Sequence, residues 1–179
     1  MQNCHRSKFI IILSFVSMML IGCGSKSEKV GMPEEFQFSY TWGAYGISSY
    51  DSASGKLIKT TDATRPVDYE TTLFLDEDTE REIYDLLKSL DLESYPDTYD
   101  PINAPDAELT IMSEPSRTLI LSVKMGDVSK IITCSDITFM NEGYDKKAQD
   151  FLDACKKLEE LLTTTEEWLA LPDYEHFYQ

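Results

Sequence analysis

Histidine is nearly absent from this sequence, and the common catalytic and metal-binding motifs do not occur at all. The 179 residues include two histidines, His5 and His176, too few for a zinc site built on several histidines. There is no C-x-x-C, H-E-x-x-H, G-x-x-x-x-G-K-[ST] or G-x-S-x-G motif. The sequence therefore predicts no catalytic residue, no metal site and no dissociable cofactor, and we expect a protein that is not an enzyme.

Basic residues are also scarce. Sixteen Lys and Arg stand against 32 Asp and Glu, which gives a net charge of −16. Because attraction to phosphate requires a basic surface, this composition excludes nucleic acid as the expected partner. An acidic surface attracts cationic proteins at a rate that falls with salt. The same charge would also keep an exported domain soluble without any partner, and the sequence leaves both interpretations open.

Long apolar runs are limited to one segment near the N-terminus. Residues 9–22 are apolar apart from Ser14 and Ser17, and they follow Arg6 and Lys8. This run is shorter than the roughly 18–20 residues that a membrane-spanning helix needs. A positively charged start followed by an apolar run of this length is typical of a secretory signal.

The apolar run ends in Leu20-Ile21-Gly22-Cys23, which closely resembles the lipobox of bacterial lipoproteins. The resemblance implies that residues 1–22 are a cleaved signal peptide and that Cys23 becomes the new N-terminus. It also implies a diacylglyceryl group on the Cys23 thiol, with a further acyl chain on its amine as an option. The expected location is then the extracytoplasmic side of a bacterial cell membrane, held by lipid. The alternative is an ordinary signal peptide in which this cysteine has no special role.

Residues 23–35 are expected to form the lipidated N-terminus and a flexible tether. Residues 24–35 are small or polar and show no apolar period. Burial of acyl chains contributes about 0.8 kcal/mol per CH₂, so two chains give a durable anchor. The chain from residue 23 keeps 14 basic and 32 acidic residues, a net charge of −18. Anionic headgroups would repel such a surface, so we expect the domain to stay beside the bilayer.

Alternating apolar residues predict a sheet in residues 36–179. Between residues 35 and 42, Phe36, Phe38, Tyr40 and Trp42 share one side, as in a half-buried strand. Gly55 is expected at positive φ in a hairpin loop. Further strands are expected at residues 47–50, 56–60, 69–75, 108–112, 118–125 and 129–134.

Two long helices with a single apolar stripe each are expected, one after Asp76 and one over residues 145–162. The pattern Thr164-x-x-Glu167 matches a capping box and predicts a last short helix. The order of strands, helix, strands and helix indicates one α+β domain. It would contain an antiparallel sheet of about five to six strands, with the two main helices packed on one face.

Four further side chains are candidates for chemistry or contact. Cys134 and Cys155 could form a disulfide after export, or remain two buried thiols. Tyr45 and Tyr50 are the aromatic residues of the first strands most suited to exposure, where they could contact a cell-wall ligand such as a glycan.

The loop at residues 95–106 also suggests a calcium site. Its acids, Asp97, Asp100 and Asp106, lack the D-x-D-x-D-G spacing that such sites use. We therefore expect a solvated loop there and no metal.

Segments such as Tyr40-Thr-Trp-Gly-Ala-Tyr-Gly and Trp168-Leu-Ala-Leu-Pro-Asp-Tyr resemble those of small lipoproteins of Gram-positive gut bacteria, a group that implies no activity. The sequence predicts a membrane-anchored, extracytoplasmic lipoprotein with a non-enzymatic binding or envelope-associated domain. One alternative is an acidic inhibitor of a cationic enzyme such as lysozyme. Another is a hydrolase of cell-wall glycan that uses carboxylates.

Overall fold

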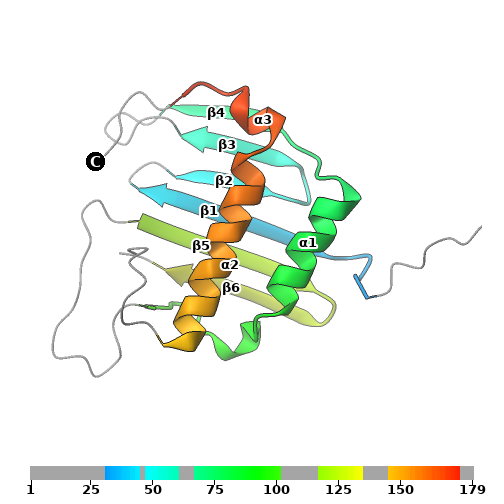
Figure 1. The fold of residues 1–179 in the computed structure, drawn as a ribbon, viewed down its shortest axis with the longest axis vertical. Coiled ribbons are helices and arrows are strands. Elements are labelled where there is room, and N and C mark those ends of the chain that lie inside the picture. The colour runs from blue at the N-terminus through cyan, green and yellow to red at the C-terminus, as the bar shows by residue number, and fades with distance from the viewer. Residues whose placement is uncertain (1–30, 45–46, 61–66, 102–116, 135–144, 174–179) are drawn as a thin grey trace, which may run out of the picture. The chain divides into compact units, whose positions relative to one another are not determined.

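The computed structural model describes residues 31–44, 47–60, 67–101, 117–134 and 145–173 (Figure 1). The chain divides into two compact units, residues 1–30 and residues 31–179, and every described residue belongs to the second. The buried apolar residues of this unit form one cluster that extends from Met32 to Trp168. The described part of this unit therefore has its own hydrophobic core.

The sheet has six strands, paired antiparallel throughout in the order β4-β3-β2-β1-β5-β6. The first four strands form a meander, and β5 and β6 form a hairpin on the other side of β1 (Figure 1). The bounds are β1 Gln37–Ala44, β2 Ser48–Asp51, β3 Lys56–Thr60, β4 Asp68–Thr72, β5 Arg117–Met125 and β6 Val128–Cys134.

The helices α1, Glu77–Lys88, and α2, Lys146–Thr163, lie on the same face of the sheet (Figure 1). Asp76 caps α1 as predicted, and its carboxylate accepts a hydrogen bond from the N–H of Thr79. Asp145, the expected first residue of the second helix, is its N-cap and accepts from the N–H of Ala148. A short 3₁₀ helix, η1, spans Leu92–Ser94, and α3 spans Glu166–Leu169. The predicted α+β fold, with two main helices on one face of an antiparallel sheet, is thus confirmed.

The core lies between the face of the sheet that α1 and α2 cover and these two helices. The aromatic face of β1 is buried as predicted, and Tyr40 is paired across the sheet with Tyr50 on one side and Leu121 on the other. The stripes of α1 and α2 close over it. The opposite face carries the alternate residues of the strands, among them Ser39, Thr41, Ser49, Ile120, Ser122, Ile131 and Thr133.

Three further predicted boundaries are wrong. The folded unit begins before residue 36, because Met32 is buried in the core and Tyr84 donates a hydrogen bond to the carbonyl of Gly31. The strand expected at residues 69–75 ends at Thr72. The N-cap of α3 is Thr165, since Thr164 is still the C-cap of α2.

The loop after α1 follows the edge strand β6 for a short distance. Thr133 donates its N–H to the carbonyl of Asp97, and its own carbonyl accepts from the N–H of Tyr99. This parallel bridge covers part of the β6 edge. The strand expected at residues 108–112 lies outside the described residues.

Candidate functional site

Negative charge among the described residues is concentrated on one side of the sheet. We define the helical layer as residues 76–95 and 145–173, which include α1, η1, α2 and α3. It holds 16 acidic and six basic residues, a net charge of −10. Of the eight charged residues of the strands, Lys59, Arg117 and Lys130 lie on the covered face, which leaves the helical side with a net charge of −7. The open face of the strands holds three acidic and two basic residues, a net charge of −1. A cationic molecule would therefore be attracted to the helical side.

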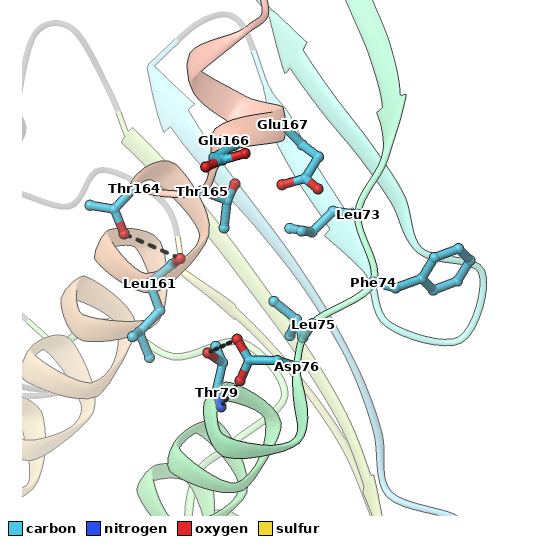
Figure 2. A pocket seen from close by; sticks show the side chains of 10 residues that line it. All are labelled: Leu73, Phe74, Leu75, Asp76, Thr79, Leu161, Thr164, Thr165, Glu166 and Glu167. Carbon is cyan, nitrogen blue, oxygen red and sulfur yellow. Dashed lines mark hydrogen bonds between the residues drawn. The ribbon is translucent and has the colours of Figure 1, made fainter.

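Two cavities lie along the line where α1 and α2 face each other. The first, which we call the α1–α3 pocket, has a volume of about 410 Å³. Four of its lining residues are apolar and six are polar: Leu73, Phe74, Leu75, Asp76, Thr79, Leu161, Thr164, Thr165, Glu166 and Glu167. Figure 2 shows Glu166 and Glu167 at the α3 end of this pocket and Asp76 with Thr79 at the α1 end.

The carboxylates of the α1–α3 pocket differ in how they are held. Asp76 accepts hydrogen bonds from the N–H and the hydroxyl of Thr79, at 2.8 and 3.2 Å. These hydrogen bonds hold the pKa of Asp76 below its usual value. Asp76 is therefore committed to capping α1, and it is not suited to act as a general acid.

The ring of Phe74 lies at the edge of this pocket and points away from it (Figure 2). It is 76% exposed and covers Gly55, since a Cβ on that glycine would come within 2.9 Å of the ring. Gly55 has φ of +70°, as predicted for the hairpin loop. A large exposed aromatic ring supplies contact area for a partner.

The second cavity, the α1–α2 groove, has a volume of about 490 Å³. Leu86, Leu90 and Ala154 supply its apolar surface. The remaining lining residues are Ser89, Asp150, Asp153 and Lys157. The α1–α3 pocket is lined by the start of α1 and the end of α2. The α1–α2 groove is lined by the end of α1 and the first half of α2. The two helices therefore run antiparallel (Figure 1).

A buried polar cluster lies beneath α2. Tyr40 is fully buried, and its hydroxyl lies against the thiol of Cys155. Burial, followed by the nearby Cys155 and Glu159, raises the pKa of Tyr40 well above its usual value. Glu159 faces Arg117, with both carboxylate oxygens 3.5 Å from one guanidinium nitrogen. Burial raises the pKa of Glu159, and Arg117 offsets part of this effect.

The side chains predicted as sites of lipidation or contact are either outside the described residues or buried. Cys23 and Tyr45 lie outside the described residues. Tyr50 is only 2% exposed, so the prediction that it is an exposed contact residue is wrong. It pairs with Tyr40 on the covered face, and its hydroxyl donates to the carbonyl of Leu73 at 3.3 Å.

Cys134 and Cys155 are both buried and are free thiols in the structure. Burial raises the pKa of Cys134 to about 12 and raises that of Cys155 well above its usual value. Because the thiolate is the reactive form, neither residue is an activated nucleophile.

No group of three or more His, Cys, Asp or Glu side chains within the described ranges is arranged to hold a metal ion. Asp97 instead pairs with Lys130 at 2.6 Å. None of the helices in the described part of the chain combines the length and the apolar character that crossing a bilayer requires.

Sequence reasoning did not find either cavity or the exposed ring of Phe74. Alternation along residues 69–75 placed Phe74 in a strand, whereas it belongs to the link from β4 to α1. The cavities depend on the distance between two helices, which no local pattern encodes. Comparison with known protein families finds no family that matches this chain, and comparison with curated proteins finds no relative.

Proposed function

We propose that this chain is a lipid-anchored, extracytoplasmic binding protein that is not an enzyme and that holds a cationic protein partner on its helical layer. The observation that carries this proposal is the charge difference between the two sides of the sheet, −7 on the helical side and −1 on the open face of the strands. A charge excess needed only for solubility would have no reason to favour one side.

The geometry of the acidic side chains supports binding more than catalysis. Glu159, the described carboxylate whose pKa is raised, faces Arg117 and lines neither cavity. A carboxylate that transfers a proton must reach a bound substrate. The hydrolase alternative therefore receives less support from the described residues.

The binding test uses chains that begin at residue 24 and carry matched charge reversals. Asp85→Lys with Asp153→Lys changes the helical layer. Glu70→Lys with Asp127→Lys makes the same change of charge on β4 and the turn between β5 and β6. The probes are polylysine and lysozyme, with polyglutamate as the negative control, and binding is measured by calorimetry between 20 and 300 mM salt.

We expect the dissociation constant for both cationic probes to rise with salt. The helical-layer variant should bind at least about tenfold more weakly at low salt, and the sheet variant should bind within about twofold of the unchanged chain. Equal weakening by both variants, or no binding by any chain, would contradict the proposal.

Inhibition of a cationic enzyme is the second candidate, and the same acidic layer favours it. It requires more than binding, because the enzyme's active site must be blocked. Measuring lysozyme activity with increasing amounts of the chain, at low and high salt, distinguishes inhibition from binding alone. Binding without loss of activity would eliminate inhibition of lysozyme and leave the first proposal intact.

The anchor has its own test in the full chain expressed in a bacterial host. Intact-mass analysis should find a chain that begins at Cys23 and carries the additional mass of acyl chains. Cys23→Ser should release the protein from the membrane fraction or leave the signal uncleaved. An unmodified mature chain that starts at another residue would contradict lipid anchoring.

A further inference from the structure

We propose that the α1–α2 groove is the docking site for an amphipathic, cationic helix of a partner protein, and that Lys157 occupies the position that a cation of the partner takes in the complex. This inference rests on the proposed function, because it specifies the shape of the cationic partner. It makes separate predictions, which concern the apolar face of the partner and the role of Lys157.

The shape of the groove favours a helix. Its walls are two antiparallel helices, whose backbone N–H and C=O groups are bonded within each helix, so an extended peptide could add no strand there. The 12 residues of α1 span about 18 Å at 1.5 Å per residue. A partner helix of three to four turns would match this length and would insert its side chains between those of α1 and α2.

The apolar part of the groove requires a partner with its own apolar stripe. Leu90 and Ala154 are buried and Leu86 is half-buried in the free chain. Side chains of the partner at i, i+3, i+4 and i+7 could pack on these three residues. A flexible polycation with no apolar face could use only the charged rim.

The rim selects the charge of the partner. Asp150 and Asp153 line the α2 side of the groove, and Glu82 and Asp85 lie on α1. A second copy of this chain carries the same acidic layer, so charge opposes self-association on this surface. Lysine or arginine on the flanks of a partner helix complements the rim.

Lys157 is the basic residue among the lining side chains of the groove. Its ammonium group reaches across to Glu82 on α1 at 3.3 Å and lies 4.0 Å from Glu160. The side chain is 42% exposed, so this pair contributes about 0–1 kcal/mol and can be displaced. An incoming cation would compete with Lys157 for the same carboxylates.

The probe is a 14-residue peptide of leucine, alanine and lysine with its leucines at i, i+3, i+4 and i+7. A scrambled peptide of identical composition is its control. Binding to chains that begin at residue 24 is followed by fluorescence anisotropy of a labelled peptide, and helix formation by circular dichroism. The protein variants are Asp153→Lys, Lys157→Met and Lys156→Met. Lys156 is the adjacent residue of α2 and does not line the groove.

We expect the amphipathic peptide to bind at least about tenfold more tightly than the scrambled peptide and to become helical on binding. Asp153→Lys should weaken binding about tenfold. Lys157→Met should tighten it about threefold or more, because Glu82 and Glu160 become available to the peptide. Lys156→Met removes the same charge from the same helix, so it should change affinity by less than half as much.

Equal binding of the two peptides, or equal effects of Lys157→Met and Lys156→Met, would overturn the docking site. Polylysine and lysozyme would still bind to the helical layer in that case, and the proposed function would stand. If no cationic probe binds, the docking site and the proposed function both fail. All the substituted residues are at least partly exposed, and circular dichroism of each variant confirms that it is folded.

Discussion

Tyr40 and Tyr50 lie opposite each other on neighbouring strands, and their hydroxyl groups differ in whether they form a hydrogen bond. The hydroxyl of Tyr40 has no nitrogen or oxygen partner in the part of the chain that the structure describes, whereas that of Tyr50 donates to Leu73. A buried polar group without a good partner costs free energy, and a buried hydrogen bond contributes about 0.5–1.5 kcal/mol.

The pair therefore makes a matched test. Tyr40→Phe should leave the free energy of unfolding unchanged or raise it by up to about 1 kcal/mol. Tyr50→Phe should lower it by about 0.5–1.5 kcal/mol. Urea denaturation monitored by fluorescence measures both. A larger loss for Tyr40→Phe than for Tyr50→Phe would show that the Tyr40 hydroxyl has a stabilising partner.

Glu159 should give stability an unusual dependence on pH. Its pKa is raised in the folded chain, mainly by burial, so the folded state binds its proton more tightly than the unfolded state. This contribution favours folding below the unfolded pKa and is lost as pH rises through the folded pKa. Compared with Glu159→Gln, the unchanged chain should gain stability between pH 7 and about pH 4.5. Denaturation of both chains across this range measures the difference, and a difference that does not vary with pH would contradict the assignment.

At the scale of elements, α3 depends on a cap that lies one residue after the predicted one. The hydroxyl of Thr165 accepts a hydrogen bond from the N–H of Trp168 at 3.3 Å. Trp168 is buried, with its ring 5.5 Å from that of Trp42 and 5.0 Å from the ammonium of Lys59. The cap thus helps to fix an aromatic side chain that packs against the end of the sheet.

Thr165→Ala should lower the free energy of unfolding by about 1 kcal/mol, since it removes the cap. Thr164→Ala is the matched control. Within the described residues the Thr164 hydroxyl bonds the carbonyls of Glu160 and Leu161 at the end of α2 and caps no N–H of α3. Thr164→Ala should therefore lower the free energy of unfolding by less than half as much. Thermal denaturation compares the two, and the opposite order would restore the predicted capping box.

The sequence predicted the helices and strands better than the packing between them. The alternation of β1 and the stripe of α2 are strong local patterns because burial repeats along one face of each element. Tyr50 lies beyond Gly43 and Gly46, where the alternation is interrupted, and only its pairing with Tyr40 shows that it is buried. The polar neighbours of Met32 predict a tether there, yet Met32 packs in the core. Both cavities arise from the spacing between helices, which is a property of packing.

At the scale of the whole molecule, the two thiols report on opening of the fold. Cys134 lies on β6 and Cys155 on α2, and both are buried. Alkylation of either thiol at pH 8 should be very slow in the native chain and should accelerate with urea as the unfolded population rises. Mass spectrometry after unfolding without reductant should find two alkyl groups on a chain that begins at residue 24. Rapid alkylation of the native chain would contradict the burial of the two thiols. If neither thiol is alkylated after unfolding, Cys134 and Cys155 have formed a disulfide, which is the alternative prediction.

The charge difference between the helical side and the open face of the strands makes the described domain an electric dipole perpendicular to its sheet. If the tether holds the domain within a Debye length of an anionic membrane, the surface potential exerts a torque on that dipole. The strands would then turn toward the lipid and the helices toward the surroundings of the cell. The orientation that lowers the electrostatic energy is thus also the one that presents the groove to arriving molecules, without any contact between the protein and the bilayer.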